Sequence, residues 1–235
     1  MKPVAIFRHY CTEGPGYFAT YLERCGLPWR IVRIDAGEPV PRDPRAFSGV
    51  AFMGGPMSVN DPLPGIEPTL ALIRSCAEAD VPVIGHCLGG QLMAKAFGGE
   101  VTRNTVKEIG WGEVRVTASA EAVRWFGTSV PGFTGFHWHG ETFSLPAGGS
   151  HVLSNAYCDN QAFALGKHFG MQCHVEMTAE LIEAWCRSGA KEIAESPGPA
   201  VQSAIAIQQE LDQRLAHLHA IADRIYARWV EGLAG

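Results

Sequence analysis

The stretch VPVIGHCLGGQLMAKAFGG, residues 81–99, decides the fold of this 235-residue chain. Residues 81–85 form a short apolar run that predicts a buried strand, and residues 88–97 have the spacing of a helix, which a pair of glycines then ends. The segment GHCLG, residues 85–89, joins the two. A strand that turns sharply into a helix is the repeating unit of α/β proteins, so this stretch predicts an α/β fold.

The same alternation precedes this stretch. Apolar runs predict strands at 3–7, 29–34 and 47–55, and helical spacing predicts helices over 17–25 and 69–79. This order is typical of a mostly parallel sheet with helices on both faces. Ligands of such sheets bind beyond the carboxyl ends of the strands, where the glycine-rich segments 54–55 and 85–90 both fall. We therefore expect these two segments to form one site.

The second half of the chain has a different pattern. Short alternating segments with Gly, Pro and Asn turns predict antiparallel strands and hairpins appended to the sheet, at 111–117, 133–143, 151–157, 161–167 and 168–176. Helical spacing returns after Met177. We expect residues 1–190 to form the main domain and residues 191–235 a C-terminal helical extension packed on that domain.

One face of the last predicted helix is apolar. This face covers the domain's own sheet in the simplest interpretation, and a homodimer seam is the alternative. Its residues are Leu211, Leu215, Leu218, Ala222, Ile225 and Trp229.

Composition excludes several classes of protein. The formal net charge is −5 with a pI near 6.0, which argues against a nucleic-acid surface because phosphate binding needs clustered Lys and Arg. The first apolar run is too short for a signal peptide, and no window has the length of a membrane span. Seven cysteines without paired spacing argue against a disulfide framework. We expect a cytoplasmic protein with reduced thiols.

Cys87 is the candidate nucleophile among these cysteines. It lies at a tight strand-to-helix turn between small residues, which is where α/β enzymes place a nucleophile. The helix that begins at Leu88 directs its positive end at the sulfur, and this favours the thiolate. A buried structural cysteine beside packing glycines is the alternative interpretation of the same pentapeptide.

A thiol nucleophile needs a base, and the base needs a group that orients it. His174 and Glu176 lie two residues apart in QCHVEM (172–177), so they share one face of an extended chain. A carboxylate there can accept the imidazole N–H and leave the other ring nitrogen for Cys87. The N–H groups of Gly55 and Leu88 are candidates for an oxyanion hole. Taken alone, the His-x-Glu pair also fits a strand histidine beside a solvated glutamate.

Three segments together resemble the class I glutamine amidotransferases of the Cys-His-Glu triad type. They are GGPMSV (54–59), GHCLGGQ (85–91) and GMQCHVE (170–176). Further segments resemble stand-alone members related to the glutaminase part of GMP synthases, and the resemblance extends from Val4 to about Ala179. These further segments are EIGWGEV (108–114), HWHGETFSLP (137–146) and NQAFALG (160–166).

The resemblance implies a flavodoxin-like fold and hydrolysis of the γ-amide of glutamine through a γ-glutamyl thioester. It gives Cys87 the role of nucleophile, His174 that of acid and base, and Glu176 that of the orienting carboxylate. Gly55 and Leu88 would form the oxyanion hole. Residues expected at the substrate are Gln91, Trp138, His139, Gly140 and Glu141.

Four positions depart from the family pattern. Trp138 replaces a common serine and Glu141 a common aspartate, and both changes fall where the α-amino end of glutamine is recognised. Val175 and Cys173 replace a common proline and phenylalanine beside His174, which leaves the triad intact. The sequence therefore leaves open whether the substrate is free glutamine or another γ-glutamyl compound.

Several functions follow from these residues. The main hypothesis is a hydrolase of γ-glutamyl bonds, which either supplies ammonia to a synthetase on a separate polypeptide or cleaves γ-glutamyl peptides or conjugates. A phosphate-binding loop of the G-x-x-x-x-G-K-[ST] type is absent from this chain. A non-catalytic regulatory subunit and a redox protein with a reactive cysteine are the alternatives from other classes.

The pair His137 and His139 has a spacing that is found in metal sites. No acidic or histidine partner is evident at helical spacing nearby, so the sequence favours neither a metal ion nor any other cofactor. His217 and His219 diverge on a helix and are expected at the surface.

Overall fold

Nine strands form one mixed sheet in the computed structural model, which describes residues 1–234. The strand order is β2-β1-β3-β4-β9-β8-β7-β5-β6, and the first five strands are parallel to one another. The remaining pairings are antiparallel, as predicted for the second half of the chain. The strands are β1 (Val4–Arg8), β2 (Trp29–Arg33), β3 (Gly49–Phe52), β4 (Val83–His86), β5 (Val101–Val116), β6 (Gly132–Phe143), β7 (Ser150–Ser154), β8 (Ala162–Leu165) and β9 (His168–Met171).

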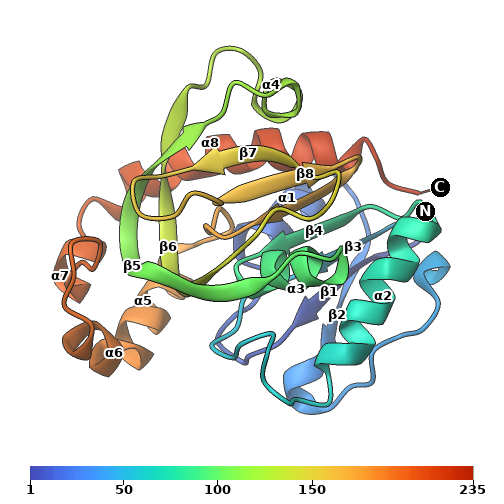
Figure 1. Cartoon of the computed structure of the whole chain (residues 1–235), viewed down its shortest axis with the longest axis horizontal. Coiled ribbons are helices and arrows are strands. Elements are labelled where there is room, and N and C mark those ends of the chain that lie inside the picture. Colours follow the sequence, from blue (N-terminus) through green and yellow to red (C-terminus); the bar gives the residue numbers. More distant parts are fainter. Residues whose placement is uncertain (235) are drawn as a thin grey trace.

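Two strands differ most from the sequence prediction, while β3 and β7 differ only in their ends. The segment 168–176 was expected to be antiparallel throughout, yet β9 pairs in parallel with β4 and is antiparallel only to β8. It ends at Met171, before the segment does. Strand β5 begins at Val101, ten residues before the predicted start. The sequence pattern did not reveal these residues as a strand, because an irregularity between Arg103 and Glu108 breaks the alternation that marks one. The long β5–β6 hairpin follows from this early start (Figure 1).

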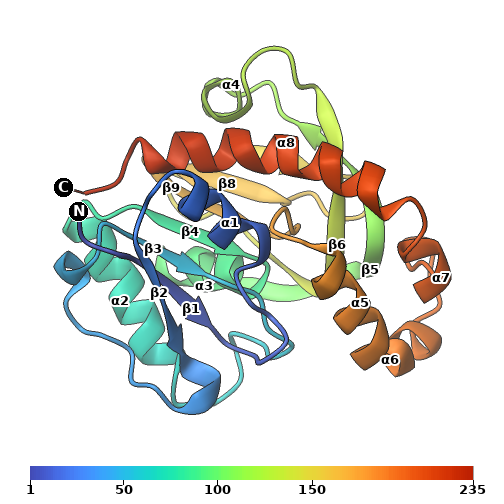
Figure 2. The same ribbon diagram turned by 180° about the vertical axis from the view of Figure 1, so that it is seen from behind.

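Helices cover both faces of the sheet. Figures 1 and 2 show α2 (Ile66–Glu78) and α3 (Leu88–Ala96) on one face, and α1 (Gly16–Arg24) and α8 (Leu211–Val230) on the other. Each face has its own cluster of buried apolar side chains. The fold is therefore flavodoxin-like, as expected. Shorter elements are η1 (Ile34–Ala36), η2 (Pro44–Ala46), α4 (Ala120–Phe126), α5 (Ala179–Ser188), α6 (Ala190–Glu195) and α7 (Ala204–Ile207).

The apolar face of α8 packs against the chain itself. Leu218, Ala222 and Ile225 are completely buried, and the α8 side chain Tyr226 contacts the ring of Phe18 in α1. The predicted stripe on this helix thus covers the protein's own core. Both histidines of this helix were predicted to lie at the surface, and His217 is exposed. His219 is not: its ring stacks on Tyr17, and its Nε2 contacts the carbonyl oxygen of Met177.

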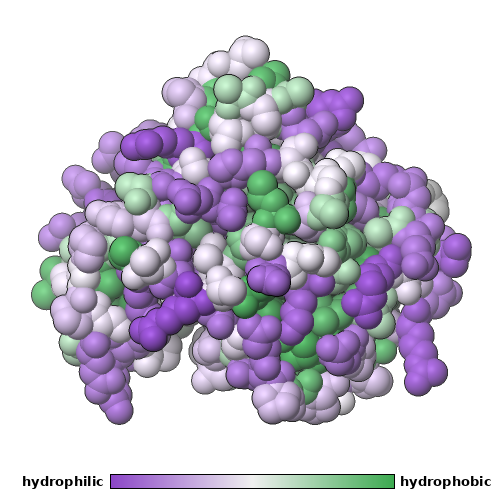
Figure 3. Space-filling view, in the orientation of Figure 1, coloured by the Kyte–Doolittle hydropathy of each residue, from purple (hydrophilic) through white to green (hydrophobic). Residues whose placement is uncertain are grey.

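The surface is mainly hydrophilic in the view of Figure 3, where hydrophobic residues form small separate groups. The large apolar side chains that stay exposed, such as Tyr10, Val123 and Ile205, are far apart in the chain. Among residues 1–234, no helix combines the length and the apolar character needed to cross a bilayer.

Candidate active site

Cys87 occupies a strained turn between β4 and α3. Its backbone angles are φ 51° and ψ −108°, and positive φ is rare for a residue with a side chain. The flanking glycines make the turn possible. A Cβ on Gly85 would lie 2.5 Å from the carbonyl oxygen of Gly89, and a Cβ on Gly89 would collide with the carbonyl group of Phe52. The predicted turn is therefore confirmed, and its strain directs the sulfur of Cys87 toward an adjoining cavity.

His174 and Glu176 lie beside this turn and face each other. Their shared orientation was predicted, and Nδ1 of His174 donates to Oε1 of Glu176 at 2.6 Å. Both side chains are buried, and a backbone bond from His174 to the Phe136 carbonyl oxygen (2.8 Å) fixes the segment to β6. His174 Nε2 has no hydrogen-bond partner within the described residues, and the ring lines the same cavity as Cys87.

The electrostatics of this pair favour an ionised state. Burial disfavours the charge on His174, but Glu176 and Cys87 outweigh it and raise the pKa of the imidazole well above 6.5. Burial also acts against a charged Glu176, yet the neighbouring His174 lowers the pKa of this carboxyl to about 2. The ring of Trp185 meets the His174 ring edge to face, with centroids 4.9 Å apart. The imidazole is thereby fixed in position, and its surroundings favour the protonated form.

Two glutamines connect the cysteine to α3. Gln172 Nε2 lies 3.4 Å from Cys87 Sγ, and Gln172 Oε1 accepts a hydrogen bond of 3.0 Å from Gln91. Gln91 lines the cavity, as its predicted role at the substrate requires. Gln172 was not predicted. It lies two residues before His174, so the alternation that identified Glu176 also places Gln172 near this face.

Gly55 and Leu88 are neighbours at the start of α3. A Cβ on Gly55 would lie 2.8 Å from Leu88 Cδ2. Leu88 is the first residue of the helix, so its N–H is among those without an intrahelical partner, and Gly55 lines the cavity. The structure thus brings both predicted oxyanion residues to the Cys87 turn.

A cavity of about 710 Å³ joins these groups. Its volume lies in the range of pockets that take drug-sized ligands, and it exceeds what one amino acid needs. Each residue of the predicted substrate segment, from Trp138 to Glu141, lines it. Glu141 accepts a hydrogen bond from Ser58 Oγ at 3.0 Å. Other lining residues include Glu13, Asp61, Arg103, Lys107, Ser188, Gly189 and Glu192.

Trp138 is tied to α6 at the wall of the cavity. Its indole N–H donates to Glu192 Oε2 at 2.9 Å, and Lys107 binds the other oxygen of Glu192 at 2.5 Å. The indole also packs on Gly189, where a Cβ would lie 2.8 Å from Cη2 of Trp138. Sequence reasoning identified Trp138 but not Glu192 or Lys107, because nothing in the pattern joins residues so far apart in the chain.

Glu13 is a second carboxyl near His174 that sequence reasoning missed. It belongs to the loop after β1 and lines the cavity. Burial raises its pKa to about 7, with opposing contributions from His174 and Glu176. The only available signal was its place beyond the carboxyl end of a parallel strand, where ligand sites lie.

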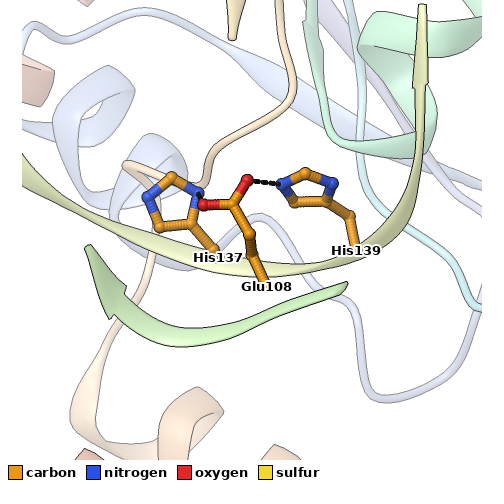
Figure 4. A group of neighbouring side chains, drawn as sticks. All are labelled: Glu108, His137 and His139. Atoms are coloured by element: carbon orange, nitrogen blue, oxygen red, sulfur yellow. Dashed lines mark ion pairs between the residues drawn. The ribbon is translucent and has the colours of Figure 1, made fainter. Parts of the chain in front are cut away.

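Glu108 lies between His137 and His139 behind the cavity wall (Figure 4). The reason for expecting no metal ion was the lack of an acidic partner for these histidines. That reason fails, because β5 places Glu108 directly opposite His139 of β6. Among residues 1–234, these three side chains are the group of ligand type close enough to hold an ion.

Comparisons with known proteins agree with this geometry. A family model described as glutamine amidotransferase class-I matches residues 17–184. The chain is 28% identical to the glutamine amidotransferase-like protein YfeJ of Salmonella typhimurium, over 81% of this chain and 82% of that protein. It is 34% identical to a GMP synthase of Paraburkholderia phytofirmans over 57% of this chain, and that match spans about a quarter (26%) of the synthase.

Solved structures give the same result. A glutamine amidotransferase from Methylobacillus flagellatus superimposes with a TM-score of 0.97 at 45% identity, covering 100% of this chain and 96% of that one. A glutamine amidotransferase from Thermotoga maritima gives a TM-score of 0.88 at 25% identity, covering 98% of each chain. The family model matches more than half of the residues and includes Cys87 and His174. The chain therefore belongs to the class-I glutamine amidotransferase family.

Proposed function

We propose that the protein hydrolyses γ-glutamyl amide bonds through a thioester on Cys87. The observation that carries this proposal is the strained Cys87 turn beside a buried His174–Glu176 pair. Nucleophile, base and orienting carboxylate are the three parts that covalent catalysis at a carbonyl group requires. A binding protein needs none of them, and this argues against a purely regulatory subunit.

The first half of the reaction forms the thioester. The Cys87 thiolate attacks the γ-carbonyl carbon, and the carbonyl oxygen becomes an oxyanion near the N–H groups of Gly55 and Leu88. When the C–N bond breaks, the leaving amine takes a proton from the His174 imidazolium. Glu176 keeps the ring in the orientation that this transfer needs.

The second half restores the enzyme. His174, now neutral, removes a proton from a water molecule, and the resulting hydroxide attacks the thioester carbonyl. The C–S bond breaks, the Cys87 thiolate and the imidazolium re-form, and a free γ-carboxylate is released. The leaving amine is ammonia when the substrate is glutamine.

γ-Glutamyl peptides or conjugates are the second candidate substrates. The cavity volume of about 710 Å³ leaves room for a leaving group larger than ammonia. Residues Ser188, Gly189 and Glu192 of its wall lie beyond the segment 17–184 that the family model matches. If free glutamine is the substrate, a separate ammonia-accepting synthetase is the expected partner.

Glutamate release from L-glutamine, γ-glutamyl dipeptides and glutathione tests the proposal, with Cys87→Ala protein as the control. Release from glutamine that requires Cys87 supports a glutaminase. Release only from the peptides supports a peptidase. No release from any substrate, together with no γ-glutamyl adduct on Cys87 by mass spectrometry, contradicts the proposal and favours a regulatory subunit.

A further inference from the structure

Three ligand-type side chains converge inside the β5–β6 hairpin. Glu108 lies opposite His139 in the strand register, and His137 points to the same side because it is two residues away on β6. His139 Nε2 is 3.0 Å from Glu108 Oε2, and His137 Nδ1 is 3.9 Å from Glu108 Oε1. All three side chains are at most 5% exposed, and Figure 4 shows both rings turned toward the carboxylate.

Hydrogen bonds orient the ligand atoms of this cluster toward one another. His139 Nδ1 lies 3.0 Å from the carbonyl oxygen of Glu141, which can only accept, so Nδ1 donates and Nε2 faces Glu108 Oε2 at 3.0 Å. The amide nitrogen of Gln161 lies 3.4 Å from His137 Nδ1 and 3.5 Å from His139 Nε2. One nitrogen of each imidazole and one carboxylate oxygen thus lie within 4.8 Å of one another.

The surroundings match the outer shell of a metal site. Ligating histidines donate their other N–H to a carbonyl or carboxylate group, and ligating carboxylates themselves accept hydrogen bonds. His139 does the first, toward Glu141. Glu108 does the second, because Asn155 donates to Oε1 and Gln161 donates to Oε2. Glu108 and His139 are therefore already oriented by hydrogen bonds, whereas His137 Nε2 has no partner among the described residues.

Distances and access also suit an ion. Donor atoms around a tetrahedral Zn²⁺ ion lie roughly 3.3–3.5 Å apart, because zinc–nitrogen and zinc–oxygen bonds are about 2.0–2.2 Å long. The ligand atoms here lie within 4.8 Å of one another. His139 Nε2 is 3.0 Å from one oxygen of Glu108, and His137 Nδ1 is 3.9 Å from the other. His139 also lines the cavity, which gives an entry path from solvent.

We propose that Glu108, His137 and His139 bind a divalent transition-metal ion of the zinc type. Two imidazoles and one carboxylate are a known zinc ligand set, and imidazole selects such ions over Mg²⁺ and Ca²⁺. The ion would join β5 to β6 directly behind Trp138 and Gly140, and so would stiffen the cavity wall. This site is separate from Cys87, and it stands or falls independently of the proposed hydrolysis.

Calorimetric titration with Zn²⁺ tests the site on chelator-treated protein. Cys87→Ala serves as the parent, because the thiol and His174 are themselves potential zinc ligands. The parent should bind one equivalent, and adding Glu108→Gln or His137→Gln should weaken that binding at least 100-fold. His217→Asn, which changes an exposed histidine on α8, should bind as the parent does. The proposal is wrong if the parent takes up no zinc or if Glu108→Gln leaves the affinity unchanged.

Cobalt substitution gives a second measurement that needs no variant in the cluster. Co²⁺ bound by two histidines and a carboxylate shows visible d–d bands without the near-ultraviolet charge-transfer band of a thiolate ligand. This spectrum at one equivalent supports the site. A thiolate band would place the metal on a cysteine and overturn the proposal. The absence of any d–d band at one equivalent of Co²⁺ would also overturn it.

Discussion

The carboxyl group of Glu13 and the imidazole ring of His174 both lie against the backbone of Gly54. A Cβ on Gly54 would lie 3.2 Å from His174 Cε1 and 3.4 Å from Glu13 Cδ. The imidazole therefore has a second carboxyl group nearby in addition to Glu176. Glu176 is held ionised, whereas burial raises the pKa of Glu13 to about 7. The charge near His174 thus changes close to neutral pH.

Replacing Glu13 with Gln should change how stability depends on pH. Between pH 4.5 and 7 the unfolded chain ionises this carboxyl while the folded chain keeps it protonated, so the wild-type protein loses stability as pH rises. Glu13→Gln removes that loss. Relative to wild type, the variant should gain roughly 2–3 kcal/mol between pH 4.5 and pH 8. Urea unfolding at both pH values measures this gain, and the exposed Glu23→Gln should follow the wild type. If the free energy of unfolding of Glu13→Gln and of the wild type depends on pH in the same way, the pKa of Glu13 is not raised.

The proposed triad predicts an order of losses. Cys87→Ala and His174→Ala should each reduce kcat for glutamate release by about 10⁴-fold or more, with unchanged circular dichroism. Glu176→Ala should also reduce kcat, but by a factor roughly ten to a hundred times smaller, because loss of the orienting residue of a triad usually has the mildest effect. Steady-state kinetics on the three variants tests this order. A Glu176→Ala enzyme slower than His174→Ala would contradict the roles.

Gly89→Ala should damage the Cys87 turn. The added methyl group would collide with the Phe52 carbonyl group, and neither backbone can yield without moving the turn or β3. We expect a stability loss of about 1–3 kcal/mol, the usual cost of overpacking, and a fall in kcat. Gly198→Ala is the matched control, since its nearest neighbour would be Val201 Cγ2 at 3.8 Å. Equal stability and activity in the two variants would show that the turn tolerates a side chain.

Glu192→Ala should release Trp138 from the cavity wall. The variant loses the hydrogen bond from the indole and the ion pair with Lys107. We expect KM to rise about threefold to tenfold with little change in kcat. The reason is that Glu192 and the Trp138 indole line the cavity wall, and Trp138 reaches the Cys87 sulfur only through its backbone carbonyl oxygen, at 3.9 Å. Glu195→Ala, on the same helix and exposed, should leave KM unchanged. A fall in kcat at constant KM would indicate that Glu192 acts in the chemical step instead.

The sequence predicted the part of the site that is local in the chain. Cys87 stands between glycines in a strand-to-helix turn, and the His174–Glu176 orientation follows from strand alternation. Both features were found where expected. The α8 stripe was predicted for the same reason, because helical spacing within one segment determines which face is buried.

The remaining features depend on pairings between distant segments. Glu108 meets His139 only because β5 and β6 pair in a particular register, and an irregularity in β5 concealed the first half of that strand. Glu192 reaches Trp138 through the position of α6, beyond any local pattern. The parallel pairing of β9 with β4 also escaped prediction, because its hairpin-like spacing suggested antiparallel partners.

The pairing of β9 with β4 also determines when Cys87 and His174 can meet during synthesis. The N–H of Cys87 bonds to the Met171 carbonyl oxygen (2.8 Å), and Gln172, which contacts the sulfur, follows Cys87 by 85 residues. Contacts of such long sequence separation form late in folding, because the intervening chain must first be ordered. A nascent chain that has folded only its first half therefore carries the Cys87 thiol without His174 beside it. The proposed γ-glutamyl chemistry would therefore begin only once β9, the last parallel strand, is paired with β4, so that turnover requires the complete parallel part of the sheet.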